Sequence, residues 1–212
     1  MKKLKLSIVI ALLSMVSIAS AQNTSFSVKG GLNLSNFSGD ISDTKMKPGF
    51  HVGVGADFEL APNLAIQSGL FFSTKGTKVE EDFEIEEFEI INGEVTVNAN
   101  FLQLPLHVAY KIDVTPGTRV VLHAGPYIAY GIAGKTKVEA SAGGVSESDE
   151  VDTFGSDGLD LKPFDSGLGL GVGAEFGSIL LDLGWDMGLT NIGDSDADVK
   201  TLNAYLSIGC RF

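Results

Sequence analysis

Apolar residues occupy every second position from Leu202 to Phe212, and the positions between them are polar or small. A period of two predicts a β-strand with two different faces. The pattern occurs in eight segments, approximately residues 25–36, 49–60, 64–75, 95–112, 118–131, 165–176, 179–189 and 199–212. Each apolar face is close to the ~9–11 residues that a tilted strand needs to cross a bilayer. The sequence therefore predicts an all-β fold, an eight-stranded antiparallel up-and-down transmembrane β-barrel.

The connections between these segments alternate between long and short. Ala61-Pro62-Asn63, the segment around Pro116-Gly117, and Gly177-Ser178 are short, whereas residues 37–48, 76–94 and 132–164 form long connections. Bacterial outer-membrane barrels have this asymmetry, with short periplasmic turns and long external loops. A soluble lipid-binding barrel is the structural alternative, but it would place its apolar side chains inside. Here the charges concentrate on the smaller, polar face, which indicates a polar lumen and an apolar exterior.

The first 21 residues have the features of a cleavable secretory signal peptide. Lys2, Lys3 and Lys5 precede a short apolar stretch, and Ala19-Ser20-Ala21 is an A-x-A cleavage site. The apolar stretch is too short for a spanning helix. We therefore expect a signal peptide over residues 1–21 and one barrel domain over residues 22–212.

The chain carries a formal net charge of −12 at pH 7. Binding to nucleic acid requires clustered Lys and Arg side chains, so this charge argues against nucleic acid as a partner. Membrane lipid is the partner that the apolar exterior predicts.

The inward-facing positions contain charges of both signs. We expect Lys111, Arg119, Glu175 and Asp182 to contribute to a polar network in the lumen, because buried charges must be paired or hydrogen-bonded. An eight-stranded barrel leaves an interior that side chains just fill. The sequence therefore predicts no open pore, with a path for protons or small ions as the alternative.

Three inward-facing histidines are candidates for metal ligands or catalytic groups. His51 falls near the loop end of its strand, whereas His107 and His123 fall lower on adjacent strands, so the three do not converge as zinc binding demands. For a serine hydrolase, His51 with Ser73 is the best available pair, but no motif supports it. Asp194, Asp196 and Asp198 lack the glycine and the distal Glu of a calcium loop. We therefore assign no catalytic, cofactor-binding or metal-binding residue.

The connection at residues 76–94 is acidic and alternates like a strand. Asn92-Gly93 between alternating runs is a strong local signal for a tight hairpin turn. We expect a hairpin that projects beyond the membrane and can bind a partner, formed around Phe83, Ile85, Phe88, Asn92 and Gly93. The alternative is a solvated hairpin whose acids prevent edge aggregation. The acidic segment Ser146–Asp152 is expected to be a mobile loop.

Two internal motifs and the chain end carry a family resemblance. Val28-Lys29-Gly30-Gly31-Leu32-Asn33-Leu34-Ser35, Phe101-Leu102-Gln103-Leu104-Pro105-Leu106 and Arg211-Phe212 resemble the PorT-like outer-membrane β-barrel family of Gram-negative bacteria. The resemblance implies an outer-membrane location with periplasmic termini, and recognition of Phe212 as an assembly signal by the barrel-assembly machinery. Most members have no known function, and one branch is linked to protein secretion and gliding.

These observations favour a non-enzymatic outer-membrane protein that displays acidic extracellular loops for binding or supports the envelope. The first alternative is an accessory barrel of a protein-secretion apparatus. The second is a lipid A-modifying outer-membrane enzyme, a class in which some eight-stranded barrels use His with Ser and an acid.

Overall fold

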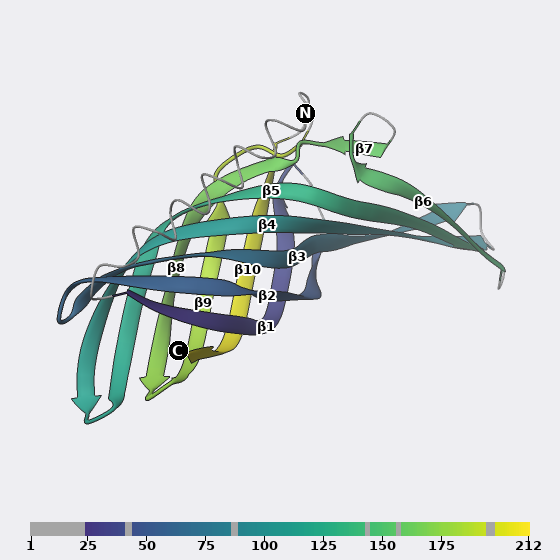
Figure 1. Ribbon diagram of the computed structural model, residues 1–212. Helices are drawn as coiled ribbons and strands as arrows, with labels where there is room; N and C mark the ends of the chain where they lie inside the picture. The colour runs from purple at the N-terminus through teal and green to yellow at the C-terminus, as the bar shows by residue number, and fades with distance from the viewer. Residues whose placement is uncertain (1–23, 41–43, 86–88, 143–144, 156–157, 194–197) are drawn as a thin grey trace.

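The computed structural model describes residues 24–40, 44–85, 89–142, 145–155, 158–193 and 198–212 (Figure 1). The expected signal peptide lies outside these residues. The strands are β1 (Thr24–Gly39), β2 (Thr44–Ala61), β3 (Leu64–Ile85), β4 (Glu89–Thr115), β5 (Thr118–Ala142), β6 (Val145–Phe154), β7 (Gly158–Leu161), β8 (Phe164–Phe176), β9 (Ile179–Gly188) and β10 (Val199–Arg211). Within the described ranges, no helix combines the length and the apolar character that crossing a membrane requires.

Eight of the strands close into a ring. The order runs β1–β2–β3–β4–β5–β8–β9–β10, and β10 pairs with β1 from Ser27↔Arg211 to Gly39↔Val199. All pairings in the ring are antiparallel, and β6 and β7 lie outside it. Closure leaves no sheet edge facing lipid, as a bilayer requires. The predicted eight-stranded antiparallel barrel is confirmed.

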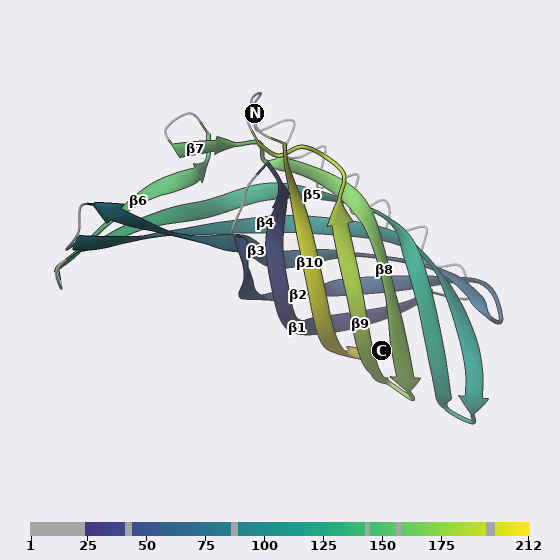
Figure 2. The ribbon, with the colours of Figure 1, turned by 180° about the vertical axis from the view of Figure 1, so that it is seen from behind.

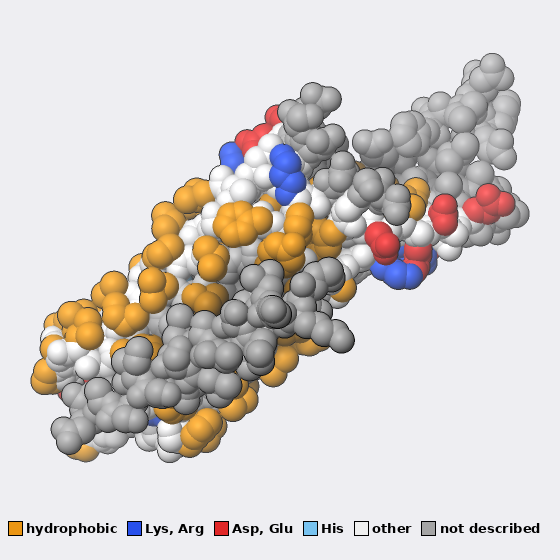
Figure 3. Space-filling view, turned by 45° about the horizontal axis from the view of Figure 1, so that its top comes forward, with side chains coloured by type: hydrophobic (Ala, Val, Ile, Leu, Met, Phe, Trp, Pro, Cys, Tyr) orange, Lys and Arg blue, Asp and Glu red, His pale blue; other side chains and the backbone are white. Residues whose placement is uncertain are grey.

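The period of two separates a lipid-compatible exterior from the lumen. On β10, Leu206 and Ile208 are 56% and 60% exposed, whereas Ser207 between them is buried. Figure 3 shows apolar side chains in orange over the visible part of the barrel wall, with charged side chains in blue and red at its margin. The interior instead collects the polar side chains of every strand in the ring. Side-chain size and polarity therefore decide which face of each strand turns inward.

The short connections meet at one end of the barrel. The N–H of Gly177 donates to the carbonyl of Gly117 at 2.8 Å, and the N–H of Arg211 donates to the carbonyl of Ser178 at 2.7 Å. Gly117 and Gly177 have φ values of 80° and 59°, a left-handed conformation that favours glycine in tight turns. The end of β10 thus lies beside the short turns, which we call the short-turn end (Figure 2).

At the opposite end, β3, β4 and β5 continue beyond the ring and, together with β6, form a projecting sheet that is visible in Figures 1 and 2. We call this the ribbon: residues 76–85 of β3, 89–98 of β4, 133–142 of β5, and β6. The expected extension of the third and fourth strands is therefore present. The expected turn at Asn92-Gly93 is wrong, because Asn92 pairs with Asp82 on one side and Ser141 on the other. Pairing with two neighbours outweighs the local turn preference, and the connection lies at residues 86–88, outside the described residues together with Phe88.

The expected mobile loop over Ser146–Asp152 is also wrong. This segment belongs to β6, which pairs antiparallel with β5 from Lys135↔Asp152 to Ala142↔Val145. Its many acidic side chains disfavour a buried strand. A solvated strand at a sheet edge tolerates them, and their charges prevent edge-to-edge aggregation. The connection at 37–48 is likewise shorter than expected, because β1 reaches Gly39 and β2 begins at Thr44.

We expect Leu106→Arg to impair assembly. Leu106 is 50% exposed in the middle of the lipid-facing run of β4, and a charge at the bilayer midplane of a barrel costs ~2–4 kcal/mol. Gln67→Arg is the control, because Gln67 lines the lumen and donates to Asp57 at 3.1 Å, so a guanidinium there has a carboxylate partner. Heat-modifiability on gels measures the assembly of the two variants, and unfolding in urea measures their stability. Equal losses in the two variants would refute the inside and outside assignment.

Candidate functional site in the barrel lumen

An ion cluster fills the short-turn end of the lumen. It consists of Asp57, Glu59, Lys111, Arg119, Glu175 and Arg211. Lys111 Nζ lies 2.9 Å from Asp57 and 3.5 Å from Glu175, and Arg119 contacts Glu175 at 2.6 Å. Three carboxylates thus balance three cations from five strands. The structure brings together Lys111, Arg119 and Glu175 of the predicted network, but places Asp182 elsewhere.

Asp182 belongs to a chain of histidines in the middle of the lumen. Asp182 lies 3.1 Å from His123 Nε2, and His123 Nδ1 lies 3.0 Å from His107 Nδ1. An ionised carboxylate only accepts, so His123 donates from Nε2, accepts at Nδ1, and leaves the lone pair of His107 on Nε2. The two rings stack with centroids 5.1 Å apart.

Two inward-facing glycines on β8 make room for these rings. A Cβ at Gly169 would lie 2.7 Å from His107 Nε2, and one at Gly171 would lie 2.5 Å from His123 Nε2. Real Cβ atoms do not approach so closely, so the imidazoles require glycine here. The alternating glycines at 167–173 therefore hold space for side chains from other strands.

His51 lies in a separate hydrogen-bonded group closer to β1. Its Nδ1 lies 2.7 Å from Asn33 Oδ1, and its Nε2 lies 2.5 Å from Ser207 Oγ. Ser73, the serine that the sequence favoured, contacts Asn33 Nδ2 at 3.0 Å and has no described bond to His51. All four side chains are buried. The pairing with Ser207 was not predicted because it depends on strand register.

One cavity of about 80 Å³ lies among these groups, lined by polar side chains with Phe71, Pro105 and Tyr205. Four buried acceptor atoms of its lining have no described partner: Gln103 Oε1, His107 Nε2, Asp186 Oδ1 and Asn203 Oδ1. Water binds such groups when the space is roomy and polar. Among the described residues, no group of three His, Cys, Asp or Glu side chains is placed to hold a metal ion.

Above the cavity, Lys75 and Asp165 are fully buried. Lys75 Nζ lies 3.5 Å from Asp165 Oδ2 and 4.8 Å from the centre of the Tyr127 ring. Asp165 also accepts from Thr201 at 2.8 Å. The ion pair, the cation–π contact and the hydrogen bond from Thr201 offset part of the cost of burying the charges.

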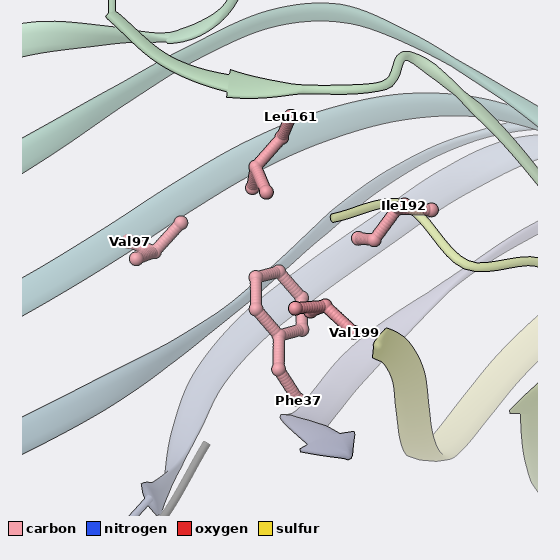
Figure 4. Close-up of a cluster of buried hydrophobic side chains, with 5 residues drawn as sticks. All are labelled: Phe37, Val97, Leu161, Ile192 and Val199. Carbon is pink, nitrogen blue, oxygen red and sulfur yellow. The ribbon is translucent and has the colours of Figure 1, made fainter. Parts of the chain in front are cut away.

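An apolar cluster covers the loop end of the lumen (Figure 4). Its buried members are Phe37, Val97, Leu161, Ile192 and Val199. Leu161 comes from β7 and Ile192 from the segment after β9, and the Ile192 carbonyl accepts from the Lys162 N–H at 2.8 Å. This cluster was not predicted, although the apolar residues Leu161 and Ile192 in polar connections were a signal for it. The ion cluster and this apolar cluster thus occupy the two ends of the lumen.

The geometry defines a β-barrel with a lipid-compatible exterior and a largely filled polar lumen. The family model for the outer membrane protein beta-barrel domain matches residues 20–194. The chain belongs to this family and is an outer-membrane β-barrel protein. A search of curated proteins gave no match.

Several solved outer-membrane proteins are similar to the chain. Ail, the attachment invasion locus protein of Yersinia pestis, solved with the heparin analogue sucrose octasulfate, has 18% identity and a TM-score of 0.37. Neisserial surface protein A has 12% identity and a TM-score of 0.45. A major outer membrane protein of Thermus thermophilus has 16% identity and a TM-score of 0.45. Each comparison covers 90% of this chain and 100% of the other.

We expect Lys111→Ala to destabilise the barrel by ~3–5 kcal/mol, because it leaves buried carboxylates without their shared cation. Lys111 and Glu175 are nearly inaccessible to solvent. The control is Lys135→Ala, which breaks the ion pair between Lys135 and Glu150. These two side chains are 67% and 53% exposed, so the loss of the pair should lower the free energy of unfolding by only ~0–1 kcal/mol. Urea unfolding in lipid bilayers measures both changes. Equal stability of the Lys111 variant and the wild type would contradict the ion cluster.

Proposed function

We propose that this outer-membrane barrel serves as a binding protein whose ribbon forms an acidic platform outside the cell. The ribbon is the observation that supports this role, because it extends the sheet well beyond the barrel wall (Figure 1). In this arrangement the short turns and the termini are periplasmic, and the long connections are external. The role requires no catalysis and is independent of the chemistry in the lumen.

The outer strand of the ribbon offers both charge and an unpaired edge. β6 pairs with β5 along one side, whereas β7 reaches its other side only at Asp152 and Phe154. Glu147, Ser148, Asp149 and Glu150 are exposed on β6. A strand edge with such side chains suits an extended, basic polypeptide that adds a strand by backbone pairing.

Other charges of the ribbon are paired within it. Lys78 donates to Glu94 at 2.7 Å, and this hydrogen bond lowers the pKa of the Glu94 carboxyl below its ordinary value. Lys137 contacts Glu139 at 2.6 Å. On β6, Glu150 pairs with Lys135 of β5 at 3.2 Å, whereas Glu147 and Asp149 are exposed acids that we expect a partner to contact.

We also propose membership of the PorT-like branch, on the resemblance of Val28–Ser35 in β1 and Phe101–Leu106 in β4. An accessory role in protein secretion follows as the second candidate, in which the ribbon or the turns contact other subunits. Recognition of Phe212 by the barrel-assembly machinery is part of the same proposal. Crosslinking in intact cells distinguishes the candidates, because a secretion subunit would be captured also at the short turns.

The orientation is tested by epitope tags. A tag inserted between Ile85 and Glu89 is expected to be labelled on intact cells, with the barrel still heat-modifiable, because the proposed topology places the far end of the ribbon outside the cell. A tag after Asn63 is expected to stay hidden until the outer membrane is permeabilised. Labelling of the Asn63 tag on intact cells would invert the topology and place the ribbon in the periplasm.

The binding role is tested by charge reversal on β6. A fluorescent peptide of alternating Lys and Thr should bind intact cells that display the wild-type barrel. The double variant Glu147→Lys, Asp149→Lys should bind this peptide with an affinity reduced at least about threefold, because each exposed ion pair contributes ~0.2–1 kcal/mol. The control variant Asp113→Lys, Thr115→Lys changes the short-turn end and should bind as the wild type does. Wild-type cells that bind no more peptide than cells without the barrel would overturn the proposal.

A further inference from the structure

We propose that the lumen contains a hydrolytic site in which Ser207 is the nucleophile, His51 the base and Asn33 a positioning residue, acting on a short-chain acyl ester. The site goes beyond the binding role of the ribbon and departs from the sequence-based expectation of no catalytic residue. A nucleophile bonded to a base that a third group orients is the arrangement that serine hydrolases share across unrelated folds.

The hydrogen bonds of Asn33 determine which nitrogen of His51 carries the proton. Asn33 Nδ2 donates to the carbonyls of Phe50 and Thr74 at 3.1 and 3.2 Å, so Asn33 Oδ1 must face His51. A carbonyl oxygen only accepts, and His51 Nδ1 therefore donates to it at 2.7 Å. The lone pair of His51 then lies on Nε2, which accepts the Ser207 hydroxyl at 2.5 Å. This is the tautomer that general-base activation of a serine requires.

The strand register brings the two reacting side chains together across a glycine. Gly31 of β1 pairs with His51 on β2 and with Ser207 on β10. A Cβ at Gly31 would lie 2.7 Å from His51 Cε1, so only glycine lets the imidazole cross β1 to reach Ser207. Three neighbouring strands of a rigid wall thus hold the nucleophile, the base and the positioning residue.

The cavity beside Ser207 limits the acyl group to a small one. Its volume of about 80 Å³ accommodates a group of acetyl size, and Ser207, His51 and Asn33 all line it. The acceptor atoms of Gln103, His107 and Asp186 on the same cavity can bind the water that the second half of the reaction needs. Tyr205, whose ring packs edge-on against His51 at 5.7 Å, and Lys29 also line the cavity and carry donors for a developing oxyanion.

The reaction proceeds in two balanced steps. Ser207 Oγ attacks the ester carbonyl while His51 Nε2 takes the hydroxyl proton, and the bond to the alcohol oxygen breaks as His51 returns that proton to the leaving alcohol. Water then attacks the acyl-serine, with His51 again as base, and releases the carboxylic acid and free Ser207. The sum is ester plus water giving acid plus alcohol, so no further reactant is needed.

Ser68 of β3 and Pro105 of β4 both line the cavity, and the Ser68 hydroxyl donates to the Pro105 carbonyl at 2.9 Å. The pairing of β3 with β4 keeps one register from Ser68↔Leu106 to Phe71↔Gln103. Pro105 has no N–H, so it donates no hydrogen bond to the ladder at this point of the wall. In this proposal the ester enters here from the bilayer, and the substrate is a short-chain ester of a membrane-borne alcohol, whose larger part remains in the lipid.

The test uses the full folded chain in detergent micelles. Methanesulfonyl fluoride, which is small enough for the cavity, should sulfonylate Ser207 with release of fluoride, located by peptide mass spectrometry. p-Nitrophenyl acetate should be hydrolysed faster than the octanoate ester, and Ser207→Ala and His51→Gln should each lose at least about 100-fold of this rate, the size of a general-base contribution.

The control is Ser27→Ala, which removes another buried lumen serine of β1 that does not line the cavity. It should keep the wild-type rate, and heat-modifiability should show that every variant is folded. Sulfonylation absent from Ser207, or an acetate rate unchanged in a folded Ser207→Ala barrel, would overturn the site. Neither result would affect the binding role of the ribbon, because peptide binding to cells is measured separately.

Discussion

Backbone hydrogen bonding in a medium without water is the constraint on which this structure depends. Lipid cannot satisfy N–H and C=O groups, so each strand in the membrane needs a partner on both sides, and the pairing of β1 with β10 supplies the last one. Closing only eight strands makes the ring narrow. Every inward side chain must then find its partners within that space. The polar layers of the lumen are a consequence of closure.

The inward side chains of the lumen find hydrogen-bond and ion-pair partners more completely at the short-turn end than in the middle. In the ion cluster, Lys111 contacts all three carboxylates, Asp57, Glu59 and Glu175. Arg119 and Arg211 balance the remaining two negative charges. The middle of the lumen differs, because the imidazoles occupy the space at Gly31, Gly169 and Gly171, yet a cavity of about 80 Å³ remains among the polar side chains. Around this cavity lie the acceptor atoms of Gln103, His107, Asp186 and Asn203, for which the described residues provide no hydrogen-bond partner. The lumen is thus divided into packed layers at its two ends and a central layer in which described acceptor atoms have no described partner.

Strands and their faces were predictable from the sequence because the period of two is local. The sequence segment 179–189 and the observed β9 (Ile179–Gly188) agree within a residue, and Leu181 and Leu183 face outward as predicted. The extra strand β6 and the continuous pairing of Asn92 were missed, since their stability comes from neighbouring strands distant in sequence. Turn preference is a property of a few residues, whereas a central strand is stabilised along its whole length.

The arrangement around His51 shows where sequence reasoning reaches its limit. The alternation along each strand predicted that the His51 side chain points inward. Whether His51 meets Ser73 or Ser207 depends instead on which residues share a register position across the closing pair of strands. Ser207 is 156 residues from His51 in sequence and meets it only because both pair with Gly31. A glycine in a strand carries no chemistry, yet its missing Cβ lets side chains of β2 and β10 meet across β1. In a narrow barrel the glycine positions therefore decide which polar side chains interact.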